Sequence, residues 1–419
     1  MRSRGCGPTA LFFALAGCAG SAPHPVSPPA PVNAPQSAAP AAPSFDEDLA
    51  FLNRFGPIDV LEAPGGGRVA VSPRWQGRVM TSAVEAHGAS LGFVHRAFLE
   101  AGKTGTPFDN YGGEDRFWLG PEGGQYGLYF PPGAPFAIGA WQTPHAMQEG
   151  EWRVTAHDDF SVEMARTMHV VNWSRAEFDV AVARTVRVLT ADEVRARLGE
   201  APPGGTKWVA FESVNRITNA GARAWTRDTG LLSIWVLGMY TPAADARILV
   251  PFDPGGSGPV VNDAYFGAIP HDRLAVHARE GWLSLVADGA QRGKIGLTAS
   301  RARDRAGSYS PSAHLLTIVR YGKPRATQAG APEYVNSMWE QQERPYAGDV
   351  VNAYNDGPTE PGKPSLGGFY ELETSSPAAA LAPGGSIEHV HTTLHVVGDP
   401  ASAPSLAAFA QRVLGVPIE

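Results

Sequence analysis

Alternation of apolar and other residues with a period of two recurs along the chain and constrains its fold more than any other feature. Residues 179–189 read DVAVARTVRVL, which places every second side chain, from Val180 to Val188 with Arg184 among them, on one face of a strand. The same alternation runs through residues 160–171, 231–239, 315–321 and 389–397. Turn signals rich in Gly, Pro and Asn separate these segments. The pattern predicts an all-β fold, a large antiparallel β-sandwich with few short helices.

Helical periodicity is weak by comparison. It predicts three helices, over residues 191–198, 332–340 and 405–414. We find no repeat of fixed period, which disfavours a propeller.

The N-terminus has the features of an export signal. Arg2 and Arg4 precede a short apolar run, residues 10–14, which is too short to span a bilayer. Leu15-Ala16-Gly17-Cys18 follows and resembles the lipobox of bacterial lipoproteins. The resemblance implies cleavage after residue 17 and a lipidated Cys18, and Ala19 after it favours the outer membrane, with the protein facing the periplasm or the cell surface. An ordinary secretory signal with a chance cysteine is the alternative.

Composition then divides the chain into three parts. We expect residues 1–18 to be a signal peptide, 19–44 an Ala/Pro-rich tether and 45–419 a single folded domain, because no second Pro/Ser-rich break appears. The net charge of −7 and the absence of a basic stripe argue against a nucleic-acid partner. We expect a monomer that meets the membrane through its lipid anchor alone.

The densest group of ionisable residues lies between positions 369 and 395. Glu371 and Glu373 share one face of a strand, and His389, His391 and His395 share a face of another. The Ala-Pro-Gly-Gly turn between them predicts that the two segments pair as neighbouring antiparallel strands. Acids and imidazoles are costly to bury without partners or a metal, so the region favours chemistry or ligand binding.

A second dense segment runs from residue 110 to 129. Glycine pairs at 112–113 and 123–124 bracket Arg116, Trp118 and Glu122. Glycines allow close approach to a ligand, while a guanidinium beside an indole offers hydrogen bonds and a stacking face. This combination suits a polyhydroxylated sugar ring. A hairpin with a structural Arg–Glu pair is the alternative.

Several short motifs resemble the galactose-mutarotase-like superfamily, of the aldose 1-epimerase type. They are Leu372-Glu373-Thr374 with Leu381-Ala382-Pro383-Gly384 downstream, the opening strands in residues 68–84, and the Asn-x-x-Thr-Asn-x-Gly strand end in 215–221. The GGEDRFW segment, residues 112–118, is similar to an uncharacterised branch of exported bacterial proteins in that superfamily. The resemblance implies a β-supersandwich fold and gives Glu373 the role of general base.

The chain departs from the epimerases at one catalytic position. Residues 218–221 read Thr-Asn-Ala-Gly, without the histidine that serves as general acid in those enzymes, and Arg116 is the nearest candidate for holding the sugar. We therefore expect a carbohydrate-binding lipoprotein with acid–base chemistry at an anomeric carbon, as in an isomerase. Glu373 would be the base and His391 the acid, with His145 as an alternative acid. The expected substrate contacts are Arg116, Trp118, Glu122, Glu371 and His395.

Alternatives remain open at this stage. A non-catalytic glycan-binding envelope lipoprotein would keep the sandwich without the chemistry, and a polysaccharide lyase or hydrolase would need a basic subsite. Glu373 could instead pair with Arg116 or Arg320 inside the sandwich. We expect no cofactor, although His389, His391 and His395 with a nearby glutamate could hold a divalent metal. Otherwise the imidazoles would bond to Glu371 and Glu373.

Overall fold

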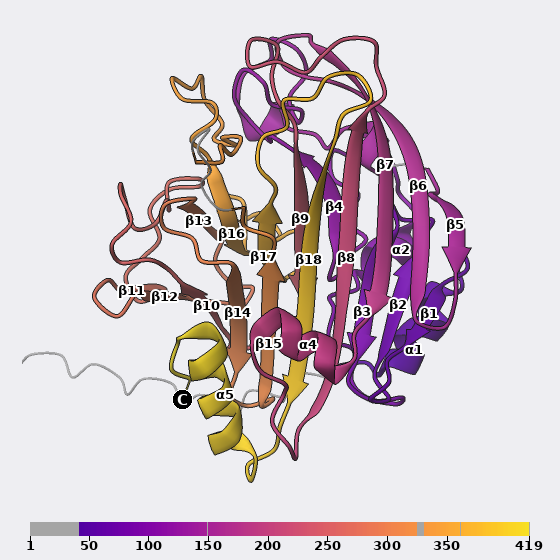
Figure 1. Cartoon of the computed structure of the whole chain (residues 1–419), viewed down its shortest axis with the longest axis vertical. Helices are drawn as coiled ribbons and strands as arrows, with labels where there is room; N and C mark the ends of the chain where they lie inside the picture. Colours follow the sequence, from indigo (N-terminus) through magenta and orange to yellow (C-terminus); the bar gives the residue numbers. More distant parts are fainter. Residues whose placement is uncertain (1–41, 149, 325–330, 361, 419) are drawn as a thin grey trace, which may run out of the picture. The chain divides into compact units, whose positions relative to one another are not determined.

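The computed structural model describes residues 42–148, 150–324, 331–360 and 362–418. Most of the predicted signal and tether, residues 1–41, therefore lies outside the described residues. The described chain is built from antiparallel sheets, and five α-helices lie at their edges and on one outer face (Figure 1). No helix among the described residues is both long enough and apolar enough to cross a bilayer.

The largest sheet has ten strands. Their spatial order is β11 (Leu274–His277), β12 (Trp282–Val286), β10 (Arg247–Pro251), β14 (Arg305–Ser310), β15 (Leu315–Tyr321), β18 (Ser386–Val397), β8 (Lys207–Asn219), β7 (Glu177–Val188), β6 (Ser161–Val171) and β5 (Arg153–His157).

The second sheet has five strands and the third has three. The five-stranded sheet follows the order β13 (Gly293–Thr298), β16 (Asp349–Asn355), β17 (Tyr370–Ser375), β9 (Ser233–Tyr240) and β4 (Arg116–Gly120). The three-stranded sheet consists of β1 (Asp59–Glu62), β2 (Arg68–Ser72) and β3 (Arg78–Ala83). The predicted all-β antiparallel sandwich is confirmed.

The ten-stranded and five-stranded sheets pack face to face. Side chains meet between them at Ser308 and Tyr370, whose hydroxyls lie 2.8 Å apart, and at Thr374, which contacts His389. Strand β7 shows why the sequence folds this way, because its Val180 to Val188 face is buried while most of the intervening residues are at least partly exposed. Two apolar cores fill the space between the layers.

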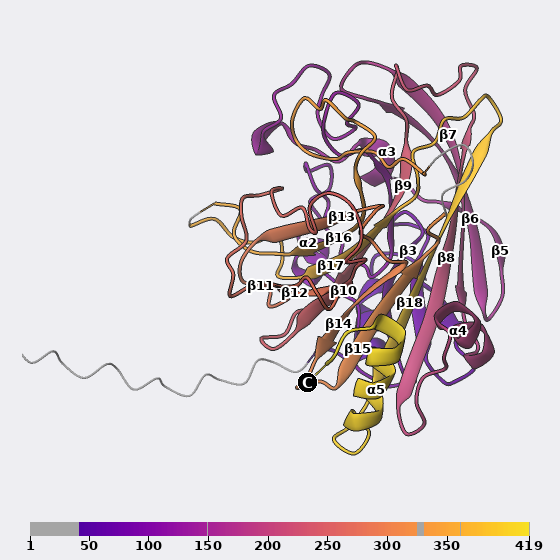
Figure 2. The ribbon, with the colours of Figure 1, turned by 60° about the vertical axis from the view of Figure 1, so that its left-hand side comes forward.

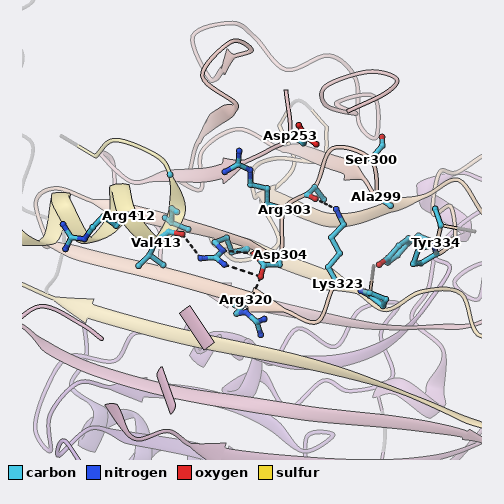
Figure 3. Close-up of a pocket in the computed structure, with 17 residues that line it drawn as sticks. Asp253, Ala299, Ser300, Arg303, Asp304, Arg320, Lys323, Tyr334, Arg412 and Val413 are labelled. Carbon is cyan, nitrogen blue, oxygen red and sulfur yellow. Dashed lines mark hydrogen bonds and ion pairs between the residues drawn. The ribbon is translucent and has the colours of Figure 1, made fainter. Parts of the chain in front are cut away.

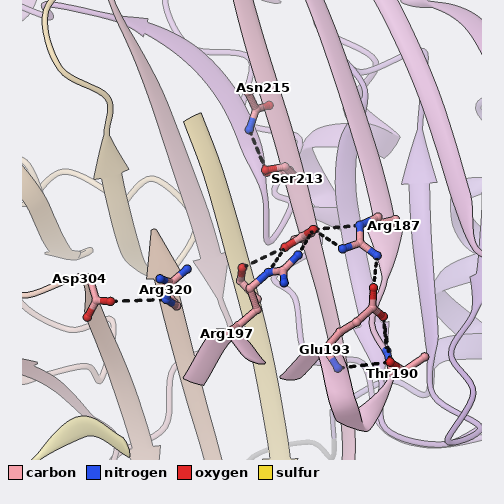
Figure 4. Close-up of polar contacts among 10 residues, drawn as sticks. Arg187, Thr190, Glu193, Arg197, Ser213, Asn215, Asp304 and Arg320 are labelled. Atoms are coloured by element: carbon pink, nitrogen blue, oxygen red, sulfur yellow. Dashed lines mark hydrogen bonds and ion pairs between the residues drawn. The ribbon is translucent and has the colours of Figure 1, made fainter. Parts of the chain in front are cut away.

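The outer face of the ten-stranded sheet is covered by α4 (Ala191–Leu198) and α5 (Ala403–Leu414), which form a third core with it (Figures 1 and 2). Both helices match the predicted segments. A capping box from Thr190 and Glu193 begins α4, and Gly199, with a φ of 90°, ends it. Figure 4 shows how Arg187 on β7 reaches Glu193, while Arg197 bonds Glu212 on β8. The remaining helices are α1 (Phe45–Leu52), α2 (Arg96–Ala101) and α3 (His145–Gln148).

Two sequence predictions are wrong. Residues 332–340 form no helix, because Tyr334 is buried and forms a bridge with Ala347. Tertiary pairing thus overrides a weak helical pattern. Strands β17 and β18 are not neighbours either, since β17 pairs with β16 and β9, while β18 pairs with β15 and β8. The turn between them carries the chain from one layer of the sandwich to the other.

Candidate functional site

One face of the five-stranded sheet carries an ordered array of charged and aromatic side chains. The register places Lys294, Tyr354 and Glu371 in one row across β13, β16 and β17. The next row places Glu373 in line with Arg116, with Leu237 of β9 between them. Because side chains two residues apart on a strand share a face, both rows project to the same side.

Two buried ion pairs join these rows. Arg116 Nη2 lies 2.8 Å from Glu371 Oε1, and Lys294 Nζ lies 3.1 Å from Glu373 Oε2. Trp235 Nε1 also donates to Glu373 Oε2, at 3.0 Å. The guanidinium of Arg116 lies 4.1 Å from the ring centroid of Trp118, so an aromatic face supports the first pair.

A cavity of about 500 Å³ opens over this array. Its charged lining residues are Arg116, Glu122, Arg292, Lys294 and Glu371. Its aromatic lining residues are Phe98, Phe108, Trp118, Trp141, Trp235, Phe266, Trp339, Tyr354 and Phe369, with His95 at the same wall. A volume of this size can hold a small organic ligand. Ligand sites are usually lined by apolar and aromatic side chains with a smaller number of polar groups among them, as this cavity is.

The cavity shifts the proton affinity of its acids. Burial raises the pKa of Glu371 to about 7, and Arg116 opposes this while the neighbouring Glu373 adds to it. Burial also raises the pKa of Glu122, whose Oε1 accepts a hydrogen bond from Trp141 Nε1 at 2.9 Å. For Lys294 burial acts to lower the pKa, but Glu373, Glu122 and Glu371 together raise it above its ordinary value.

Some of the buried polar atoms that have no hydrogen-bond partner belong to this cavity. They are Nε of Arg116, Nε1 of Trp118 and Nε of Arg292. Buried polar groups are nearly always paired, so unpaired ones around a single cavity indicate a place where a ligand completes the hydrogen bonding.

The structure brings together four of the predicted site residues. Arg116, Trp118, Glu122 and Glu371 all line the cavity, from segments up to 255 positions apart in the sequence. Glu373, the predicted base, is fully buried and contacts the lining residues Lys294 and Trp235 rather than lining the cavity itself.

The predicted histidines lie on the other side of β17, inside the sandwich. Thr374 Oγ1 lies 2.8 Å from His389 Nε2 and 2.9 Å from His391 Nδ1. His395 bonds Glu114 at 2.9 Å through Nε2. Because Thr374 and Glu373 are adjacent on a strand, they face opposite ways, so His391 does not meet Glu373 across the cavity. The expected bonds from the imidazoles to Glu371 and Glu373 are therefore absent from the described contacts.

The histidine row is also a poor metal site. Within the described ranges, no group of three or more His, Cys, Asp or Glu side chains could hold a metal ion. Burial lowers the pKa of His389 to about 3, so its imidazole is neutral, and burial lowers that of His391 as well. Neutral imidazoles bonded to one hydroxyl form a structural network between the layers. His145 begins α3 and is not a lining residue.

The other predicted partners of the acids lie elsewhere. Arg320 pairs with Asp304 at 3.4 Å on the ten-stranded sheet (Figure 4). Arg78 is buried and donates to the backbone oxygen of Trp75 at 3.2 Å. Arg78, Arg116 and Arg320 therefore do not form one basic subsite.

Sequence reasoning missed two charged cavity residues, Arg292 and Lys294. Their spacing was the available signal, because Arg292, Lys294 and Gly296 alternate along β13 and its start. A Cβ at Gly296 would lie 2.1 Å from a carboxylate oxygen of Asp349, so a larger residue there would displace that side chain. Three tryptophans, Trp141, Trp235 and Trp339, also line the cavity.

A larger cavity, of about 1080 Å³, lies near β14, β15 and α5 (Figure 3). Several of its charged groups already have partners: Arg305 bonds Asp304 and the Val413 carbonyl oxygen, each at 2.8 Å, and Arg412 pairs with Glu200. Tyr334 is the one aromatic residue among its described lining residues. This larger cavity therefore offers little surface on which a ring-shaped ligand could stack. The cavity of about 500 Å³ over the five-stranded sheet, called the aromatic cavity below, is the stronger candidate.

The fold and the cavity define a large antiparallel β-sandwich protein with a charged, aromatic-lined site on its smaller main sheet. The family model described as "Family of unknown function (DUF6786)" matches residues 43–419. The chain belongs to this family. No protein of curated function matches it.

Solved structures with a similar fold cover about four fifths of the chain. An aldose 1-epimerase candidate from Escherichia coli K12 is 14% identical with a TM-score of 0.48, over 81% of this chain and 98% of that one. A galactose mutarotase related enzyme from Lactobacillus acidophilus is 8% identical (TM-score 0.44; 81% and 97% covered). A galactose mutarotase-like protein from Lactobacillus casei ATCC 334 is 12% identical (TM-score 0.42; 81% and 100% covered).

Proposed function

We propose that this chain binds a saccharide in the aromatic cavity and catalyses proton transfer at its anomeric carbon. One observation carries the proposal: two carboxyl groups, Glu122 and Glu371, line a single cavity whose walls are rich in aromatic side chains. Indole and phenyl rings stack on the C–H face of a sugar, while a few charged groups fix the hydroxyls. The motifs around Glu373 that resemble aldose epimerases support the same class of ligand.

The chemistry needs a base and an acid on two sides of the ring. A carboxylate removes the proton of the anomeric hydroxyl, and a protonated carboxyl gives a proton to the ring oxygen as the ring C–O bond breaks. The open-chain aldehyde then recloses from its other face and both transfers reverse. Glu371 can take either role near neutral pH, because its pKa is about 7. Glu122, with its raised pKa, supplies the second carboxyl.

The positions of these two acids suit a ring placed between them. Glu371 is on β17 and Glu122 follows β4, and the two strands flank β9. Neighbouring strands are about 4.8 Å apart, so the strands that carry the acids are separated by roughly 10 Å. Glu373 then has a positioning role in this mechanism, because it holds Lys294 and Trp235 against the cavity.

The test is anomer exchange measured by NMR with a panel of aldoses, for wild type and the variants Glu371→Gln and Glu122→Gln. Loss of a general acid or base lowers turnover by roughly 10²-fold or more, and we expect this of both variants. Glu388→Gln is the control, because Glu388 is exposed and forms an ion pair with Arg216 outside the cavity. If Glu371→Gln exchanges anomers at the wild-type rate, the proposed mechanism is wrong.

A non-catalytic glycan-binding protein is the second candidate. It is favoured by the pairing of Glu371 with Arg116 and of Glu373 with Lys294, which already satisfies one oxygen of each acid. Saturation transfer from the protein to a sugar, without anomer exchange, would establish this alternative.

We also propose, from the sequence, that the chain is a lipoprotein of the outer membrane anchored at Cys18. The Leu15-Ala16-Gly17-Cys18 motif behind an apolar run supports it. Replacing Cys18 by Ser should abolish incorporation of labelled palmitate and release the protein from the membrane fraction. Unchanged labelling would contradict the anchor.

A further inference from the structure

We propose that the cavity selects a sugar with an anionic substituent, a carboxylate or a phosphate ester, and that Arg292 binds the anion. This inference rests on the proposed saccharide function and names the class of sugar. It follows from a comparison of the three cations that line the cavity.

Two of the three cations are neutralised within the protein. Arg116 pairs with Glu371 at 2.8 Å, and Lys294 pairs with Glu373 at 3.1 Å. Arg292 differs from both, because it takes part in no ion pair among the described residues. Its Nε atom is buried and has no hydrogen-bond partner.

Arg292 is nevertheless held in a defined position. Its guanidinium carbon lies 3.5 Å from the ring centroid of Phe266 and 6.0 Å from that of Tyr354. Both rings line the cavity with it. A guanidinium stacked on an aromatic face keeps its donors directed outward in the ring plane, which suits a bidentate contact with a carboxylate or phosphate.

The position of Arg292 relative to Glu371 gives the ligand its orientation. Arg292 precedes β13 and stands two residues, about 7 Å, before Lys294, which shares a row with Glu371. A ring whose anomeric carbon faces Glu371 would therefore direct an exocyclic substituent toward Arg292. Thr359 and Ser365 line the same cavity and offer hydroxyl donors.

The charges of the cavity agree with this choice. The positive side chains that line it are Arg116, Arg292 and Lys294, while the negative ones are Glu122 and Glu371, with Glu373 behind them. Burial favours the neutral forms of Glu122 and Glu371, so protonation of either leaves the cavity with an excess of positive charge. A neutral sugar would leave the Arg292 charge unmatched, whereas an anion would compensate it.

The test is the binding of matched sugars to the full chain, by calorimetry or saturation-transfer NMR at pH 7 in a buffer without phosphate. The ligands are galactose, galacturonate and galactose 6-phosphate, with the corresponding glucose series. We expect at least one anionic sugar to bind roughly 10- to 100-fold more tightly than its neutral parent, because charge-assisted hydrogen bonds to a partly buried guanidinium are strong. Which anion binds more tightly distinguishes the carboxylate from the phosphate.

The variants assign the effect to Arg292. Arg292→Gln should remove the preference for the anion, measured as the ratio of the affinities for the anionic and the neutral sugar, and Arg292→Lys should restore part of that ratio. Arg279→Gln is the matched control, since Arg279 is exposed and does not line the cavity.

The outcomes separate this inference from the proposed function. Equal binding of neutral and anionic sugars to wild type would overturn the anionic subsite and leave the saccharide function standing. An anion preference that persists in Arg292→Gln would overturn the role of Arg292. Failure of every sugar to bind would overturn both proposals. The wild-type comparison decides the ligand class even where a variant does not fold.

Discussion

Lys294 stands in one row with Glu371, yet its ammonium bonds the other glutamate of β17, Glu373, at 3.1 Å. Arg116 shows the opposite pairing: it is in line with Glu373 but forms its ion pair with Glu371. The two ion pairs therefore run diagonally across adjacent rows of the sheet. Each charge lies near both charges of opposite sign, which couples the four groups and fixes the floor of the cavity.

This coupling should appear in a double-mutant cycle of Lys294→Met and Glu373→Gln. Each single change leaves one buried charge uncompensated, so we expect each to lower the free energy of unfolding by about 3–5 kcal/mol. The double variant should lose less unfolding free energy than the two single variants together, by about 1 kcal/mol or more. Chemical denaturation measures the unfolding free energy of all three variants. The exposed pair Lys207 and Glu85 is the control and should show near-additive, small effects, whereas additivity at Lys294 and Glu373 would contradict the coupling.

Glu371 should give the protein a particular pH dependence. Its pKa is raised from 4.5 to about 7 in the folded state, so between these values the folded protein binds more protons than the unfolded chain. The contribution of Glu371 to stability is therefore greatest below pH 4.5 and decreases as pH rises to 7. Glu371→Gln lacks this titration. The free energy of unfolding of wild type relative to Glu371→Gln should fall across this window, and a constant difference would show that Glu371 titrates normally.

Thr374 should matter for stability and not for ligand binding. Its hydroxyl is within hydrogen-bond distance of His389 and His391, both buried between the sheets. Thr374→Val should lower the free energy of unfolding by about 1–3 kcal/mol, because it leaves buried imidazole nitrogens unpaired. Sugar affinity should change little, since Thr374 faces away from the cavity. Thr374→Ser keeps the hydroxyl and should retain most of the stability. A large loss of affinity in Thr374→Val with stability intact would place the histidines in the site.

The fully buried ion pair between Arg184 and Asp115, 2.6 Å apart, should be one of the strongest structural determinants of the sandwich. Asp115→Asn leaves the guanidinium of Arg184 buried without its counter-charge, and we expect a loss of about 3–5 kcal/mol of unfolding free energy. Asp192→Asn at the exposed pair with Arg195 is the matched control and should have little effect. Equal melting temperatures for the two variants would contradict the expectation.

The sequence by itself determined the local structure of this protein wherever the pattern was strong. The alternation in residues 179–189 predicts β7, and the helical periodicity of residues 191–198 predicts α4, because strand and helix periodicities are properties of neighbouring residues. It also identified Arg116, Trp118, Glu122 and Glu371 as candidates, since glycine-flanked charges and paired acids are local signals.

Only the tertiary structure decided which of these residues meet. Sequence cannot fix whether the strand after a turn pairs with its neighbour or crosses to the facing sheet, and β18 crosses. That choice separates His391 from Glu373 and leaves the histidines to Thr374 and Glu114. The strand order of the five-stranded sheet likewise brings Lys294 on β13, and Arg292 just before it, to the acids of β17. Lys294 and Glu373 are 79 positions apart in the sequence. Burial and charge pairing at such distances depend on sheet order and register, and neither can be seen in any single segment.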